Sequence, residues 1–278
     1  MTRIYLLLLT LILIISSMTH IVVSHKAEAV FFNVGQGDSY AFKTNDNRVI
    51  LIDGGPDWTS LYCLGRWLNY FEREIDTILL THTHSDHITA LPEIIKRYKV
   101  KKIILPHRLI GPESIALLDS LKASTEIIYP EKEFCFDFNP DCYLCVLPPS
   151  TNFKNSQDDN DLSLATYFNC SGLKIFGAGD APSPREKEMM SSKLISTTDI
   201  LKISHHGSKY SSSIDFLNFI SPKLAIISAG KNNRYKHPHS ELIHRLEEAD
   251  LIIWRTDIEG SALFYTSNKE LFSKQINW

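Results

Sequence analysis

The chain has 278 residues, of which 44% are hydrophobic and 22% charged, and its formal net charge is −3 at pH 7. This length and apolar content suffice for a packed core, which excludes a disordered protein. The small negative charge excludes general electrostatic attraction to nucleic acid or anionic membrane, so such a partner would need a local basic patch or a metal ion.

The first residues differ from the rest of the chain. An apolar run over residues 4–15 follows Arg3, and a second short one covers residues 21–23. The first run has the length of a signal-peptide core and is short for a membrane-spanning helix. We therefore expect residues 1–27 to be a signal peptide or an uncleaved N-terminal membrane anchor; the lack of a polar face disfavours a buried helix. Either form predicts an exported protein, secreted, periplasmic or anchored at the outer face of the membrane.

Short apolar segments recur through residues 28–278, which we expect to form one catalytic domain. Their β-branched content and their apolar character on both faces predict buried strands, and segments with helical periodicity lie between several of them. Strands are expected at residues 29–34, 49–52, 77–80, 102–105, 173–176, 199–203 and 224–227, and helices at residues 61–71, 89–98, 113–122, 184–190 and 240–248. This alternation predicts an α/β fold.

The five cysteines are too scattered for a disulfide scaffold or a zinc knuckle. Residues 134–138 and 142–147 predict two strands around a turn, in a register that places Cys135 opposite Cys145. Export would permit a disulfide there, whereas buried strand cysteines commonly only pack. Both interpretations stay open at this point.

A dense group of metal-binding residue types follows the strand at residues 77–80. Four of them fall within six residues, namely His82, His84, Asp86 and His87. Imidazole and carboxylate together suit zinc, manganese or iron, and the lack of cysteine disfavours a soft thiolate site. A solvated loop that is only rich in histidine would not need four candidate ligands within six residues. The segment therefore predicts a metal-binding cluster.

The pattern HxHxDH resembles the second motif of the metallo-β-lactamase superfamily. Asp53-Gly54-Gly55 matches the family's first motif, whose aspartate supports the metal site, and Gly179-Asp180 matches the motif that supplies a bridging aspartate. Alone, these aspartates would suggest a turn and a helix cap. The resemblance implies an αββα sandwich, with two packed β-sheets and helices on both outer faces, and two divalent metal ions, zinc or manganese.

Further motifs are similar to those in the metallo-β-lactamase domain of ComEC-type DNA-uptake competence proteins. They are the VGQGD segment at residues 34–38, Asn160 with Ser163, His205-His206-Gly207-Ser208, and the segment at residues 233–238. The likeness runs from about Val30 to Leu263, with departures at Asn33 and Leu162. No run of spanning helices for a DNA channel is expected, so DNA transport would need a separate membrane channel protein as a partner.

The superfamily's usual third histidine has no good candidate here, so other histidines are expected to complete the coordination. We expect His82, His84 and one member of the His205-His206 doublet on the first ion, and Asp86, His87 and His237 on the second. Asp180 would bridge them. Because successive strand residues face opposite sides, only one doublet histidine should ligate, and His206 is favoured slightly.

Such a site would hydrolyse its substrate with a metal-bound hydroxide. Asp53 would support the site, Asp86 would orient the nucleophile, and His237 or the spare doublet histidine would protonate the leaving group. Residues near the motifs are candidates for substrate binding, although turn positions explain Asn160 and Ser163 equally well: Asn160, Ser163, Ser208, Asn233, Arg234 and Tyr235.

Phosphodiester hydrolysis, with DNA as substrate, is the first expectation. Lys231, Arg234 and Lys236 flank His237 and would attract a phosphate backbone. The five basic residues at 96–102 fit a solvated helix end better. One alternative is hydrolysis of a small ester, such as a phosphorylcholine ester or a lactone. Another is a non-catalytic DNA-binding accessory of a competence channel.

Overall fold

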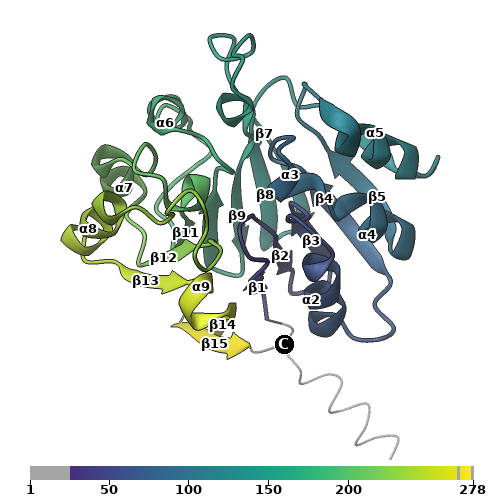
Figure 1. Ribbon diagram of the computed structural model, residues 1–278. Coiled ribbons are helices and arrows are strands. Elements are labelled where there is room, and N and C mark those ends of the chain that lie inside the picture. Colours follow the sequence, from purple (N-terminus) through teal and green to yellow (C-terminus); the bar gives the residue numbers. More distant parts are fainter. Residues whose placement is uncertain (1–25, 268–269, 277–278) are drawn as a thin grey trace, which may run out of the picture.

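Two β-sheets pack face to face between outer helices in the computed structural model, which describes residues 26–267 and 270–276 (Figure 1). One sheet has eight strands in the order β15-β14-β1-β2-β3-β4-β5-β6, and the other has seven in the order β13-β12-β11-β10-β9-β8-β7. This confirms the expected αββα sandwich.

The eight-stranded sheet combines the first half of the chain with two strands from its end. Its strands are β1 (Glu28–Phe31), β2 (Tyr40–Lys43), β3 (Val49–Ile52), β4 (Glu74–Leu79), β5 (Lys99–Ile104), β6 (Glu126–Ile128), β14 (Ser261–Ser267) and β15 (Glu270–Ile276). The seven-stranded sheet contains β7 (Phe134–Asn139), β8 (Cys142–Leu147), β9 (Ala165–Cys170), β10 (Leu173–Gly177), β11 (Ile200–Lys202), β12 (Leu224–Ile227) and β13 (Ile252–Arg255).

Helices cover the outer face of each sheet. On the eight-stranded sheet they are α2 (Thr59–Trp67), α4 (Leu91–Arg97) and α5 (Gly111–Ser120), with the short α3 (Ser85–Ile88) at the end of β4. On the seven-stranded sheet they are α6 (Ser183–Met189), α7 (Ile214–Ile220) and α8 (Ser240–Glu248), and the short α9 (Thr256–Glu259) follows β13.

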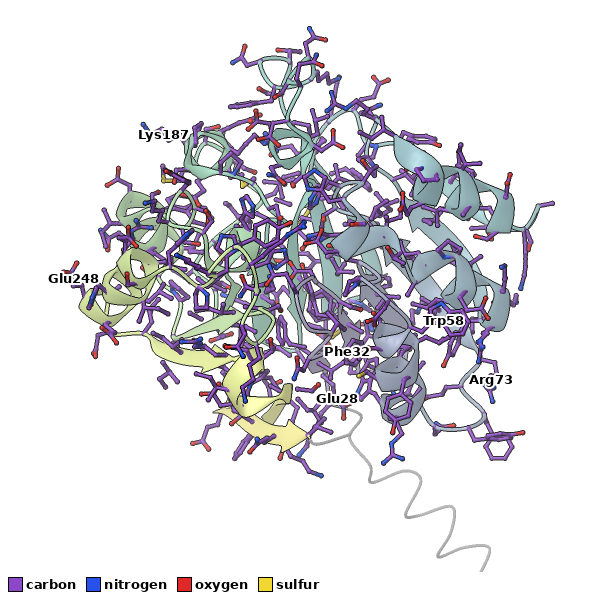
Figure 2. All side chains as sticks on the ribbon, viewed as in Figure 1. Glu28, Phe32, Trp58, Arg73, Lys187 and Glu248 are labelled. Atoms are coloured by element: carbon purple, nitrogen blue, oxygen red, sulfur yellow. A yellow bond between two sulfur atoms is a disulfide. The ribbon has the colours of Figure 1, made fainter. Side chains whose placement is uncertain are left out.

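Strand β3 shows why this sequence folds into layers. Ile50 and Ile52 pack between the sheets, while Val49 and Leu51 face the α2 and α4 side, and all four are at most 2% exposed. Because side chains alternate along a strand, a strand that is apolar at every position must be covered on both faces. Side chains fill the space between the layers (Figure 2).

Two disulfides join neighbouring strands at one end of the seven-stranded sheet. Cys135 pairs with Cys145 across β7 and β8, in the register that the sequence predicts, and Cys142 pairs with Cys170 across β8 and β9. The second bond was not expected. Cys63 is the free, buried cysteine.

Thiol counting should therefore give one reactive thiol per denatured chain without reductant and five after reduction. Reduction should also lower the free energy of unfolding, by about 3 kcal/mol per bond in the chain-entropy model, because each bond restricts the unfolded chain. The measurements are a colorimetric thiol titration and urea unfolding with and without reductant. Three or five thiols before reduction would contradict the pairing.

Residues 1–25 of the predicted leader lie outside the described residues, whereas Ala27, its last residue, is fully buried in the core between the sheets. Within the part of the chain that the structure describes, no helix is long and apolar enough to cross a membrane.

Candidate metal centre

The candidate site lies where strands of both sheets end at a common edge. Asp53 follows β3, the segment at residues 81–87 follows β4, and Asp180 follows β10. His205 and His206 follow β11, and His237 lies on the loop after β12. Ligands bind at such strand ends in α/β folds because the loops carry polar side chains on a rigid scaffold.

Asp53 is fully buried and orients His87. Its two carboxylate oxygens accept hydrogen bonds from the Thr81 backbone N–H at 2.7 Å and the Thr81 hydroxyl at 2.8 Å. The second oxygen also lies 2.8 Å from Nδ1 of His87. A proton on Nδ1 leaves the lone pair of Nε2, 3.4 Å from Asp180, free for a metal. This contact would let Asp53 act through His87, and the supporting role predicted for Asp53 stays a prediction.

One group of imidazole nitrogens near Asp180 includes those of the HxH residues, His82 and His84. Nε2 of His82 and Nε2 of His205 each lie 3.8 Å from Oδ2 of Asp180. Nε2 of His82 is also 3.1 Å from Nδ1 of His84. This group contains His82 and His84, as expected for the first ion, but its doublet member is His205 and not the slightly favoured His206.

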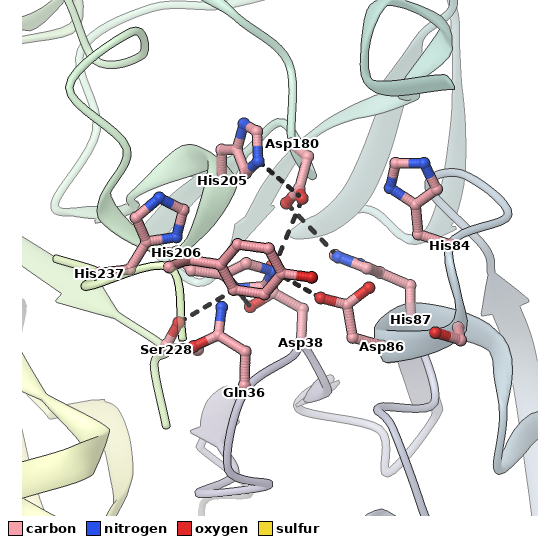
Figure 3. A network of polar contacts seen from close by, with 12 residues as sticks. Gln36, Asp38, His84, Asp86, His87, Asp180, His205, His206, Ser228 and His237 are labelled. Atoms are coloured by element: carbon pink, nitrogen blue, oxygen red, sulfur yellow. Dashed lines mark hydrogen bonds and ion pairs between the residues drawn. The ribbon is translucent and has the colours of Figure 1, made fainter. Parts of the chain in front are cut away.

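A second group lies on the other side of Asp180. Nε2 of His206 is 3.2 Å from Oδ2 of Asp86 and 3.5 Å from Oδ2 of Asp180. Ligand atoms of Asp86, His87 and His206 lie within 4.8 Å of one another, as do those of His82, His87 and Asp180. His206 therefore occupies the place beside Asp86 and His87 in which His237 was expected (Figure 3).

The histidine doublet is not part of a strand. Both residues lie in a 3₁₀ turn (Ser204–Gly207) with φ of 53°, in the left-handed region. Gly207 continues the turn at φ 92°, and a Cβ there would lie 2.5 Å from Pro238. Strand alternation therefore does not apply, and both imidazoles face Asp180.

His237 lies at the rim, with its ring centroid 5.5 Å from that of His205 and 6.4 Å from that of His206. Burial and the nearby His205 lower the pKa of His237 to about 4. The ring is then neutral at pH 7 and can donate one hydrogen bond, but it carries no extra proton for a leaving group.

Buried polar atoms without a hydrogen-bond partner are concentrated at the site. Among the described residues, twelve buried side-chain nitrogen or oxygen atoms lack a hydrogen-bond partner. Seven of these belong to this site: Gln36 Nε2, Asp38 Oδ1, His87 Nε2, Asn160 Oδ1, Asp180 Oδ1, His206 Nε2 and His237 Nδ1. Because buried polar groups are normally paired, this concentration indicates a site shaped for ligands.

The pKa shifts of the site residues also indicate a site for positively charged ligands. Burial lowers the pKa of His206, but Asp180 and Asp38 outweigh it and raise that pKa to about 10. Burial raises the pKa of Asp180, but His206 and His87 outweigh it and hold that pKa well below its usual range. The carboxylates thus stabilise positive charge here, which divalent ions would supply in place of protons.

Behind His206 lies a buried ion pair that the sequence did not reveal. Nζ of Lys202 is 2.6 Å from Oδ2 of Asp38, and both side chains are at most 1% exposed. The other Asp38 oxygen is 3.5 Å from Nδ1 of His206, which also lies 3.1 Å from the Ser228 carbonyl. Asp38 of the VGQGD segment thus helps to turn Nε2 of His206 toward Asp180.

Replacing Lys202 with methionine should lower the free energy of unfolding of the metal-free protein by about 3–5 kcal/mol, because Asp38 would stay buried without its partner. Urea unfolding measures this, and adding Asp38→Asn should recover much of the loss. Lys223→Met is the matched control, since Lys223 is 72% exposed and its pair with Asp199 is worth at most about 1 kcal/mol. Equal effects of the two lysine substitutions would contradict this account.

A cavity of about 350 Å³ opens over the two ligand groups. Asn160 and Tyr235 line it, together with Gln36 and Ser85, which the sequence did not single out. Ser163 lies beneath it, where its Oγ accepts a hydrogen bond from the Asp180 backbone N–H at 3.3 Å.

The other three substrate-binding candidates do not line this cavity. The Asn233 amide holds the loop together through the backbone carbonyls of Gly230, at 2.9 Å, and His237, at 2.5 Å. Oγ of Ser208 accepts from the Tyr210 backbone N–H at 3.3 Å. Arg234 is exposed and contacts the Tyr235 hydroxyl.

The chain is similar to known proteins in sequence. A family model described as "Metallo-beta-lactamase superfamily" matches residues 32–119. ComE operon protein 3 of Bacillus subtilis is 29% identical over 88% of this chain and 34% of its own length. Competence protein ComA of Neisseria gonorrhoeae is 27% identical over 86% of this chain and 32% of its own length. The chain thus spans about a third of these relatives.

The fold is also that of solved structures. The metallo-β-lactamase fold protein YhfI of Bacillus subtilis superposes with a TM-score of 0.57 at 10% identity, over 90% of this chain and all of YhfI. Together, these comparisons show that the chain has the metallo-β-lactamase fold and that its sequence is similar to the metallo-β-lactamase superfamily and to ComEC-type competence proteins.

Proposed function

We propose that this metal-dependent hydrolase cleaves phosphodiester bonds and that its substrate is DNA. The observation that carries the proposal is the position of Asp180. Its carboxylate lies within 3.8 Å of imidazole nitrogens of His82, His87, His205 and His206, so that one side chain faces both ligand groups. A shared carboxylate between two sets of ligands is typical of two-metal hydrolases.

The distances support one ligand assignment. His82, His84 and His205 would hold one ion, and Asp86, His87 and His206 the other, with Asp180 bridging. His237 would remain free for the substrate. Zinc or manganese suits these nitrogen and carboxylate donors.

When bound, two such ions supply a water of lowered pKa and stabilise negative charge on the oxygens that attack and depart. Asp86, whose side chain is 26% exposed at the cavity, orients the attacking water through its carboxylate. His237 donates a hydrogen bond toward the leaving oxygen from the rim. Asp53 and Asp38 hold the rings of His87 and His206 in place.

The distribution of basic side chains supports an anionic polymer as substrate. A second cavity of about 490 Å³ shares His237 with the first and is lined by Lys231 and Lys236, while Arg255 in the same lining is paired with Asp257 at 2.7 Å. A phosphate backbone that passes His237 would meet these cations. In contrast, the basic residues at 96–102 are engaged in surface ion pairs with Glu93, Glu74, Asp76 and Glu126.

A substrate panel tests the proposal. The protein, loaded with manganese or zinc, should cleave single-stranded or duplex DNA and bis(p-nitrophenyl) phosphate, and a chelator should abolish both activities. Hydrolysis of only a phosphorylcholine ester or a lactone would replace DNA by a small ester as the substrate. Metal-dependent binding of DNA without any turnover would indicate an accessory protein instead.

We also propose that the chain acts outside the cytoplasm. Its two disulfides support this, because such bonds persist in oxidising compartments. Fractionation of cells that express the whole chain should place the protein in the medium or at the membrane, protease-accessible in intact cells or spheroplasts. A reduced, protease-protected cytoplasmic protein would contradict the proposal.

A further inference from the structure

Gln36 brings a side-chain amide to the cavity, and an amide is not a usual ligand of zinc or manganese. It lies on the loop between β1 and β2 and lines the cavity together with Asp86, Asp180 and His206. Figure 3 shows its side chain entering the group of site residues from this loop. Gln36 belongs to the VGQGD segment at residues 34–38, but the sequence alone assigns it no role.

The orientation of the Gln36 amide is fixed by a backbone contact. Its Oε1 accepts a hydrogen bond from the Gly230 N–H at 3.0 Å. A backbone N–H can only donate, so the oxygen of the amide must face Gly230 and the nitrogen must face the other way. Gly230 permits this approach, since a Cβ there would lie 2.7 Å from the Gln36 backbone nitrogen.

The nitrogen of the same amide has no acceptor. Nε2 of Gln36 is buried and makes no hydrogen bond within the described residues. A buried donor without an acceptor is destabilising, and a polar site tolerates it where a ligand supplies the missing acceptor. The carboxylates of the cavity are the proposed metal ligands, so the acceptor would come from the substrate.

We propose that Gln36 is a substrate-binding residue whose Nε2 donates a hydrogen bond to a non-bridging oxygen of the phosphodiester. This inference rests on the proposed phosphodiesterase function. A neutral amide suits the task because it binds an anionic oxygen without adding positive charge beside two cations. The Gly230 contact holds the amide in its binding orientation, so the Gln36 side chain need not change rotamer when the substrate binds.

Two substitutions separate the donor from its structural contact. Gln36→Glu keeps an oxygen that can accept from Gly230 but replaces the donor, whereas Gln36→Leu removes both. Loss of the donor is the change that they share. Both variants should lose about 100- to 1000-fold in kcat/KM for bis(p-nitrophenyl) phosphate, the size of effect seen when one oxyanion donor is removed. The inhibition constant of inorganic phosphate should rise in both.

Metal content and melting temperature serve as independent readouts. Both variants should retain two ions per chain, and only Gln36→Leu should melt at a lower temperature. Wild-type kcat/KM and phosphate inhibition in Gln36→Glu would overturn the inference, because Gln36 would then serve only the Gly230 contact. Loss of an ion in both variants would overturn it too. If the wild-type protein cleaves no phosphodiester at all, the proposed function itself fails.

Discussion

Asp180→Asn should abolish turnover while leaving the fold intact. Asparagine has the same shape but lacks the negative charge that both ligand groups share, so the metal pair should not assemble. We expect kcat to fall by at least about 10³-fold, which corresponds to about 4 kcal/mol of transition-state stabilisation. The metal content should fall below two ions per chain.

The measurements are steady-state hydrolysis of bis(p-nitrophenyl) phosphate and metal analysis by mass spectrometry. Asp119→Asn is a matched control, because Asp119 lies on the exposed side of α5 away from the site. Full activity and two ions in Asp180→Asn would remove the bridging role from Asp180.

His206→Ala and His237→Ala should affect the site in different ways. Nε2 of His206 faces Asp86 and Asp180, whereas His237 stands at the rim beside the doublet. His206→Ala should therefore lose one of the two ions and about 10³-fold in kcat. His237→Ala should keep both ions and lose about 10- to 100-fold, since a positioned hydrogen-bond donor contributes less than a metal ligand.

Metal analysis after dialysis separates the two variants, and activity is measured on the same preparations. The opposite result, with an ion lost in His237→Ala and retained in His206→Ala, would restore the ligand grouping that the sequence suggested.

The strands next to the site were predictable because their residues are apolar throughout. The predicted strands at residues 49–52 and 224–227 have the observed bounds of β3 and β12. Strand β9 (Ala165–Cys170) was missed because Thr166 and Asn169 interrupt its apolar pattern. The Cys142–Cys170 bond was missed with it, since the pairing requires β8 and β9 to be neighbours.

Within the site, local motifs were informative and long-range contacts were not. The HxHxDH spacing is a property of one loop, so the sequence revealed it. Lys202 lies in a segment that reads as an ordinary strand, and its partner Asp38 is 164 residues away. The doublet adopts a left-handed turn that a strand pattern does not reveal, so the positions of His206 and His237 relative to Asp180 could not be predicted from the sequence.

The most direct test of the two-ion site is anomalous diffraction from crystals of the manganese- or zinc-loaded protein. We expect two anomalous peaks on either side of Asp180. One should lie against His82, His84 and His205, and the other against Asp86, His87 and His206. A single peak, or two peaks that do not share Asp180, would contradict the account.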